Sequence, residues 1–165
     1  SGLELSERAV REGVSGVQWE GRLEMLEARP DILLDGAHNP AGAEALAAFL
    51  RSMKETRPGS RVIVVLGMMR DKDHKAFMAS LSSVADHVVL TSASIARSAT
   101  AEELRDELEG VIASASSVTA GPSEALALAR QLAAPRDVIC VTGSLMLIGE
   151  VKASWRGCGL SPLRG

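Results

Sequence analysis

The sequence predicts an α/β fold, namely a Rossmann-like three-layer domain around a sheet of about six strands. Short apolar runs alternate with helical patterns along the 165 residues, as in βαβ units with a parallel sheet. Several runs are apolar at almost every position, which is typical of strands covered on both faces. Right-handed crossovers would then place helices on both faces of a mostly parallel sheet with one antiparallel strand.

Each expected element has a local signal. The segments RLEML and DILLD are joined by only a few residues, so we expect them to pair antiparallel. Asn39 before Pro40, Asp73, and Thr100 with Glu103 are N-cap patterns that start three of the helices. We expect strands at 22–26, 31–35, 61–67, 87–91, 117–121 and 137–143, and helices at 5–16, 41–55, 73–84, 100–114, 122–133 and 144–155.

Composition limits the class of protein. The chain is 46% apolar and 24% charged, which is typical of a globular domain, and we expect one domain over 1–165 with a core at 5–155 and a loose tail at 156–165. The net charge of −3 without a basic run gives no indication of nucleic-acid binding. No stretch reaches the roughly 20 apolar residues needed to cross a bilayer. Cys140 lies in an apolar run, which favours a reducing, cytoplasmic setting.

Polar residues gather where two of the expected strands end. Ligands of open parallel sheets bind beyond the carboxyl ends of the strands, so the segment DGAHNP after the strand at 31–35 is a candidate site. Gly36, Asn39 and Pro40 are accounted for by a turn and a helix start. Asp35 and His38 are not needed for that turn, and on local grounds a site and a plain turn are equally supported.

Two other loops carry weaker signals. Ser144 in VTGS stands at a helix N-terminus that could bind an anion, although an ordinary N-cap is the simpler interpretation. Lys72 and Asp73 could orient a charged group or make a solvated, capped turn. The three histidines lack metal-ligand spacing, so we expect no metal held by this chain alone. Neither a phosphate loop nor G-x-G-x-x-G is found, so the phosphate cradle for any nucleotide would lie on another domain.

Four motifs in order carry a resemblance to a known family. The motifs are GRLE (21–24), LLDGAHNPAG (33–42), GMMRDKD (67–73) and VTGSLMLIGE (141–150). Over residues 5–155 the sequence resembles the C-terminal domain of folylpolyglutamate synthase, a group that includes bifunctional dihydrofolate synthases and belongs to the Mur ligase superfamily. The resemblance implies an ATP-dependent amide ligase, in which a substrate carboxylate becomes an acyl phosphate that the glutamate amine attacks.

The resemblance also implies roles for single residues. Arg22 and Asp35 would contact ATP, His38 would act in catalysis near the γ-phosphate and the incoming glutamate, and Ser144 would hold a glutamate carboxylate. Asn39, Lys72 and Asp73 are secondary candidates. Two departures affect loop geometry and local packing, since Glu20 stands where the family has proline and Met146 where it has tyrosine.

The resemblance further implies partners outside this chain. The phosphate loop and the Mg2+ ligands of the family belong to a larger N-terminal ATPase domain that this chain lacks, so we expect the chain alone to be inactive. The substrates would be ATP, dihydropteroate or folate, and L-glutamate. Two alternatives remain, namely the C-terminal domain of a muramyl-peptide ligase and a stand-alone Rossmann-like nucleotide-binding or regulatory module.

Overall fold

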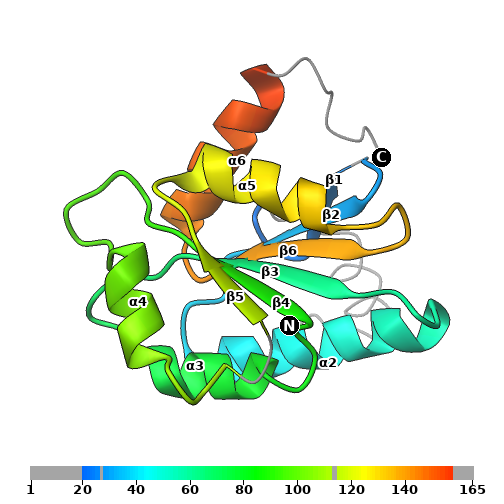
Figure 1. The fold of residues 1–165 in the computed structure, drawn as a ribbon, viewed down its shortest axis with the longest axis horizontal. Coiled ribbons are helices and arrows are strands. Elements are labelled where there is room, and N and C mark those ends of the chain that lie inside the picture. Colours follow the sequence, from blue (N-terminus) through cyan, green and yellow to red (C-terminus); the bar gives the residue numbers. More distant parts are fainter. Residues whose placement is uncertain (1–19, 27, 113–114, 158–165) are drawn as a thin grey trace, which may run out of the picture.

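The computed structural model of the protein describes residues 20–26, 28–112 and 115–157. The helix expected at 5–16 and the tail from residue 158 onward lie outside these residues. The described part contains one six-stranded sheet with the strand order β1-β2-β6-β3-β4-β5 (Figure 1). Its strands are β1 (Glu24–Leu26), β2 (Asp31–Asp35), β3 (Val62–Leu66), β4 (His87–Leu90), β5 (Ala115–Val118) and β6 (Val138–Thr142).

The strand directions confirm the predicted fold class. β1 pairs with β2 antiparallel, Met25 standing opposite Leu33. The other neighbours in the sheet pair parallel. The result is a mostly parallel α/β sheet with one antiparallel strand.

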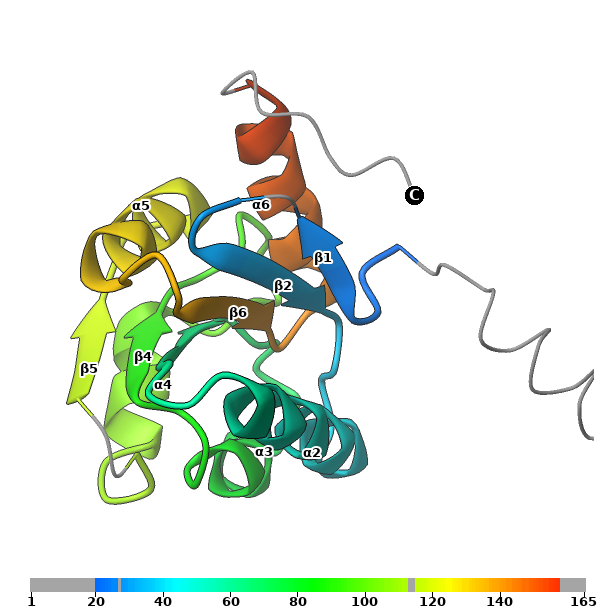
Figure 2. The same cartoon turned by 90° about the vertical axis from the view of Figure 1, so that its right-hand side faces the viewer.

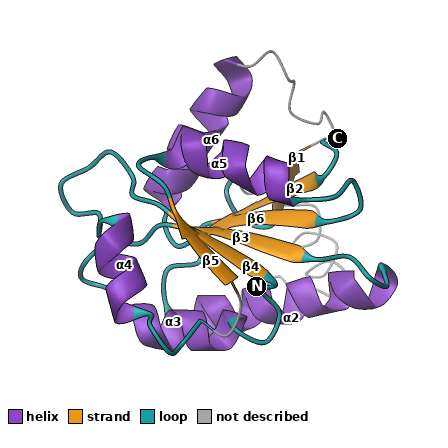
Figure 3. Cartoon of the chain, viewed as in Figure 1, coloured by secondary structure: helices purple, strands orange, loops and turns teal. Residues whose placement is uncertain are grey.

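Helices cover both faces of the sheet, as Figures 2 and 3 show. Successive residues of a strand point to opposite faces, so Val64 packs in one apolar cluster while Val65 packs in the other. The first cluster contains residues of α2 (Pro40–Thr56), α3 (His74–Leu81) and α4 (Ala101–Glu107), and the second contains residues of α5 (Pro122–Leu132) and α6 (Leu145–Gly157).

The predicted N-caps are confirmed. The Asn39 side chain accepts a hydrogen bond from Gly42 N at the start of α2, and the Asp73 side chain accepts one from Ala76 N at the start of α3. Thr100 and Glu103 form the complete capping box of α4. These short-range contacts depend on residues three apart, which is why local sequence predicts them.

Most of the expected elements have other bounds in the structure, for example the helix expected at 73–84, which is His74–Leu81. Three of the differences have a clear cause. The strand expected at 22–26 begins only at Glu24, because Leu23 at φ 45° turns the chain just before it. The helix expected at 100–114 ends at Glu107, and Gly110 at φ 78° shows that the chain has left helical geometry. The strand expected at 117–121 is Ala115–Val118, because parallel pairing with His87–Leu90 sets its register.

The position of β6 determines where a ligand can bind. The chain passes from β2 through α2, β3, α3, β4 and α4 to β5, and then returns through α5 to insert β6 between β2 and β3. The helix after β6 packs on one face, whereas the helices after β2 and β3 pack on the other. The loops that leave these three carboxyl ends therefore diverge, which is the switch-point geometry where ligands of such sheets bind.

Candidate functional site

Backbone hydrogen bonds join four loops along the carboxyl edge of the sheet. Gly36 N donates to Gly21 O at 2.7 Å. On the next strand Gly143 N donates to Ala37 O at 3.0 Å, and Gly67 N donates to Thr142 O at 3.3 Å. The loops that follow or precede β1, β2, β6 and β3 thus form one connected rim, and loops far apart in sequence are fixed relative to one another.

Two glycines permit this close approach. Gly143 has φ 102°, and a Cβ there would lie 2.6 Å from Gly67 O. A Cβ on Gly36 would lie 2.4 Å from Leu145 Cδ2, so Leu145 packs directly over the DGAHNP turn. A larger residue at Gly143 would push the loops apart, because its Cβ meets the backbone, whereas at Gly36 the Leu145 side chain would have to move.

Asp35 is a buried carboxylate that organises the rim. Asp35 is the last residue of β2, and it is 6% exposed. Oδ1 accepts a hydrogen bond from Ala37 N at 2.9 Å, and Oδ2 accepts one from Leu23 N at 3.0 Å. Each carboxylate oxygen has a second lone-pair site, so the group fits an additional donor such as a ribose hydroxyl.

His38 is half-buried, with one ring nitrogen held in place. Nδ1 lies 2.9 Å from Gly36 O, and because a carbonyl only accepts, Nδ1 carries the proton. Nε2 makes no hydrogen bond to the described residues, and in the neutral ring it is the acceptor. His38 therefore presents a fixed nitrogen that can take a proton from a ligand.

Ser144 lies at the start of α6 with 4% exposure. Its Oγ accepts a hydrogen bond from Leu147 N at 3.0 Å, which confirms the N-cap interpretation. The hydroxyl proton is left over to donate to an anion, and the helix N-terminus favours negative charge there. N-cap and ligand group are therefore compatible roles for this residue.

The loop of GRLE holds Arg22 at the edge of the sheet. Gly21 has φ 72° and Leu23 φ 45°, and a leucine in the left-handed region costs about 1 kcal/mol or more. Arg22 between them is exposed, and its guanidinium makes no hydrogen bond or ion pair within the described residues. An exposed, unpaired guanidinium beside a strained turn fits a phosphate or carboxylate ligand.

Lys72 and Asp73 are engaged within their own loop. Lys72 Nζ lies 3.1 Å from Asp71 Oδ2, and this hydrogen bond is the leading cause that lowers the pKa of Asp71. Asp73 caps α3. None of the described contacts joins these two side chains to Asp35, His38 or Ser144, and their role as secondary candidates remains a prediction.

The large exposed apolar side chains also mark this edge. Leu23, Leu145 and Met146 are 43%, 52% and 48% exposed, and all three belong to loops or helix starts of the rim. Exposed apolar groups beside polar ones indicate a surface that contacts a ligand or another domain.

Two side chains of α6 make long-range contacts that the sequence did not predict, one an ion pair and the other a pair of hydrogen bonds. Lys152 Nζ lies 2.8 Å from Glu24 Oε1, and Glu150 accepts hydrogen bonds of 2.7 Å from both the backbone N and the Oγ of Ser94. Glu24 and Glu150 lie within the quoted motifs, but their partners are distant in the sequence, so no spacing pattern could reveal them.

The described residues contain no group of three or more His, Cys, Asp or Glu side chains that could hold a metal ion. In the same part of the chain, no helix has the length and apolar character needed to cross a membrane.

The fold defines a class of protein, a doubly wound α/β domain, and the rim at its carboxyl edge is the candidate site. The model of the family described as Mur ligase, glutamate ligase domain, matches residues 21–145. The chain therefore belongs to the Mur ligase family and spans its glutamate ligase domain.

Individual relatives agree with the resemblance to folylpolyglutamate synthases. The dihydrofolate synthase/folylpolyglutamate synthase of Bacillus subtilis (strain 168) is 30% identical over 148 residues, which are 90% of this chain and 33% of the relative. The structure of E. coli FolC in complex with DHPP and ADP superimposes with a TM-score of 0.80 at 31% identity, over 96% of this chain and 36% of that one. A bifunctional folylpolyglutamate synthase/dihydrofolate synthase with Mn, AMPPNP and L-glutamate bound gives a TM-score of 0.78 at 29% identity, over 93% and 36%.

The chain thus spans about a third of the length of the Bacillus subtilis and Escherichia coli dihydrofolate synthase/folylpolyglutamate synthases that it matches.

Proposed function

We propose that this chain is the C-terminal domain of an ATP-dependent amide ligase that adds L-glutamate to dihydropteroate or folate. The observation that supports this most is the convergence of Asp35, His38 and Ser144 on one rim, at the switch point of a domain whose relatives are folylpolyglutamate synthases. A larger N-terminal ATPase domain would supply the phosphate loop and the Mg2+ ligands.

The proposed roles follow from the geometry of each group. The guanidinium of Arg22 suits a phosphate of ATP, and the free lone pairs of Asp35 suit a ribose hydroxyl. The Ser144 hydroxyl and the N-terminus of α6 would hold a carboxylate of the incoming glutamate. These contacts position the reactants, and positioning is the main source of rate in reactions of this type.

In the proposed reaction His38 accepts the proton that the glutamate ammonium loses. The γ-phosphoryl group passes from ATP to the carboxylate of the folate substrate, which gives an acyl phosphate and ADP. The amine of glutamate then attacks the acyl carbon, the amide bond forms and phosphate leaves. The glutamate ammonium must first lose a proton, and His38 Nε2 would accept it, a role supported by the contact of Nδ1 with Gly36 O, which leaves Nε2 as the acceptor. Bound Mg2+ would neutralise charge on the phosphoryl groups.

The test compares this chain with the full-length ligase that contains it. Each is given ATP, Mg2+, L-glutamate and dihydropteroate, and release of ADP and phosphate is measured. We expect turnover by the full-length protein alone, and Asp35→Ala should reduce it at least about 100-fold because nucleotide and rim lose their shared anchor. Calorimetry with ATP should show weak binding by the isolated chain.

Asp31→Ala is the matched control, because Asp31 stands at the opposite end of the same strand and pairs with Arg57 there. It should leave turnover unchanged. Full activity from the isolated chain would contradict the need for a second domain. Activity with a UDP-muramyl substrate in place of dihydropteroate would identify a muramyl-peptide ligase, and tight ATP binding without turnover in either protein would identify a binding module.

A further inference from the structure

We propose that Lys152 is a positioning residue whose ion pair with Glu24 holds the loop of residues 20–24, and with it Arg22, in the geometry that the nucleotide site requires. Its link to nucleotide rests on the proposed function, whereas its effect on the loop does not. Lys152 lies about two turns along α6 from the helix start beside Ser144, and Figure 2 shows α6 next to β1 and β2.

The contact between the two side chains is close and largely shielded from water. Lys152 Nζ lies 2.8 Å from Glu24 Oε1 and 3.0 Å from Oε2, with side-chain exposures of 11% for the lysine and 20% for the glutamate. Glu20 adds a longer contact of 3.5 Å. Removal of one partner from such a shielded pair leaves the other charge poorly compensated.

Glu24 transmits the ion pair to the backbone of the loop. Its Oε2 also accepts a hydrogen bond of 2.7 Å from Gly21 N, so the carboxylate binds the lysine and the turn at once. Without Lys152, rotation of the Glu24 carboxylate into water would be favourable, because water would solvate its charge. The Gly21 N–H would then lose its acceptor.

The loop needs such support because its backbone is strained. Leu23 is the residue other than glycine that has a positive φ within the described chain. Strained conformations persist where several contacts over-determine them, and three act here. Gly36 N binds Gly21 O, Asp35 binds Leu23 N, and Lys152 acts through Glu24.

Arg22 depends on this support because, within the part of the chain that the structure describes, its side chain makes no hydrogen bond or ion pair. It lies between the two residues with positive φ, and its exposed side chain contacts no described partner that would fix its direction. The turn sets the point at which the Arg22 side chain leaves the backbone, and the ion pair between Lys152 of α6 and Glu24 supports the turn through Gly21 N. The same helix starts beside Ser144, so Lys152 also ties the Arg22 side of the site to the proposed glutamate side.

The first test measures amide hydrogen exchange in this chain. In Lys152→Met the apolar stem is kept and the charge removed, and we expect the Gly21 and Leu23 amides to exchange about tenfold faster. Lys152→Arg should restore most of the protection. Glu24→Gln tests the same pair from the other side if Lys152→Met does not fold.

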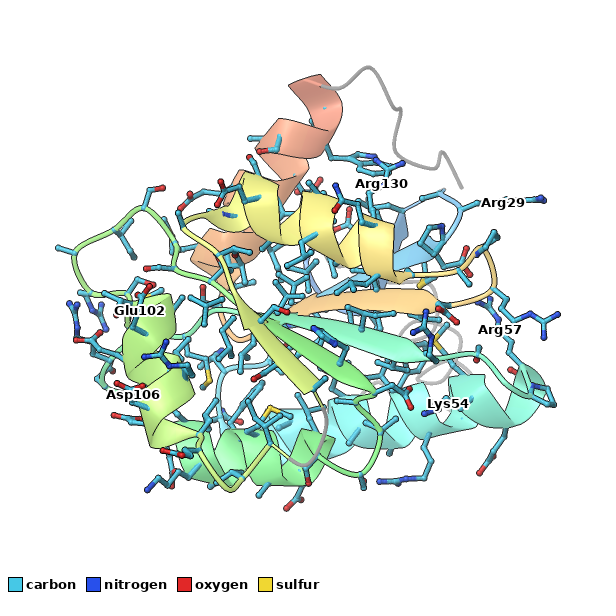
Figure 4. All side chains as sticks on the ribbon, in the orientation of Figure 1. Arg29, Lys54, Arg57, Glu102, Asp106 and Arg130 are labelled. Atoms are coloured by element: carbon cyan, nitrogen blue, oxygen red, sulfur yellow. The ribbon has the colours of Figure 1, made fainter. Side chains whose placement is uncertain are left out.

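Lys54→Met is the matched control, because Lys54 makes a comparable ion pair of 2.7 Å with Asp86 at the far end of the sheet. Figure 4 labels Lys54 and Arg57 at the end of the sheet where β3 begins. Unchanged exchange at Gly21 and Leu23 in Lys152→Met, or an equal change in Lys54→Met, would overturn the proposal.

The second test measures steady-state kinetics of the full-length ligase. Lys152→Met should raise the KM for ATP about tenfold, with smaller changes in kcat and in the KM for glutamate, and Lys152→Arg should rescue it. Arg22→Ala distinguishes the nucleotide role of the loop from the positioning role of Lys152. If it leaves the KM for ATP unchanged, the proposed nucleotide role of the loop fails, and if it raises the KM while Lys152→Met does not, the positioning role is overturned.

Discussion

The two edges of the sheet use charged residues in different ways. At the amino edge, where the parallel strands begin, charges neutralise one another. Asp137 binds Arg61 at 2.8 Å, Asp86 binds Lys54 at 2.7 Å, and Asp31 binds Arg57. The carboxyl edge also has ion pairs, between Lys152 and Glu24 and between Lys72 and Asp71. Asp35, however, is satisfied there by backbone N–H groups, and the Arg22 guanidinium stays unpaired within the described residues.

The difference distinguishes a structural edge from a functional one. A carboxylate paired with an arginine has its charge neutralised by a cation of the same domain. One that is bound by two N–H groups has no such cation and has lone pairs free for a ligand. This contrast agrees with a structural role for the amino edge and supports the proposal of a charged ligand at the carboxyl edge. Three substitutions test this contrast.

The largest expected effect is that of Gly143→Ala at the carboxyl edge. Its φ of 102° and the 2.6 Å approach of a Cβ to Gly67 O should together lower the free energy of unfolding by about 4 kcal/mol. Gly59→Ala is the control from the amino edge. There φ is 79° and the nearest atom, Arg136 Nη1, is 3.9 Å away, so only the backbone cost of about 1 kcal/mol applies. Urea unfolding measures both, and equal losses would show that the rim is not tightly packed.

A smaller effect is expected for Asp137→Ala at the amino edge. Asp137 is 2% exposed, and its carboxylate accepts hydrogen bonds from Arg61 N and Ala134 N besides the guanidinium. Burial raises the pKa of Asp137, but these hydrogen bonds and the nearby charge of Arg61 outweigh it and lower the pKa. Its loss should cost about 3 kcal/mol in urea unfolding.

The same substitution should leave the KM for ATP of the full-length ligase unchanged. A raised KM at a temperature where the variant is fully folded would mean that the amino edge also serves the site.

The smallest effect concerns the pH dependence of stability, which the contrast assigns to the amino edge. Burial and then the charge of Arg61 lower the pKa of His87 below its usual 6.5. The folded state thus favours the neutral ring. Stability is fully present above about pH 6.5 and declines as the pH falls from there through the lowered pKa.

His87→Gln should remove that decline, so the urea midpoint of the variant should fall less than that of the parent between pH 7 and about pH 5. Parallel midpoint curves for the two proteins would show that His87 does not carry this dependence.

Local sequence patterns predicted the fold class and the helix starts, because these depend on residues close together in the chain. Apolar runs marked buried strands, and the capping residues Asn39, Asp73 and Thr100 acted as expected. The ends of the helix at 100–114 and of the strand at 117–121 were wrong, because pairing with β4 and the turn at Gly110 decided them. The sequence singled out Asp35 and His38 as polar groups that the turn did not need, but in the structure both side chains bind the backbone of this turn, at Ala37 N and Gly36 O.

The sequence by itself thus determined which segments become strands and helices, which glycine and polar residues end up at strand ends, and which family the chain resembles. Only the tertiary structure decided that β6 inserts between β2 and β3, that Asp35 binds the backbone at Leu23, and that Lys152 reaches Glu24. The physical reason is that these contacts join segments separated by a dozen to more than a hundred residues. Such contacts form only when the sheet assembles, and no short-range spacing encodes them.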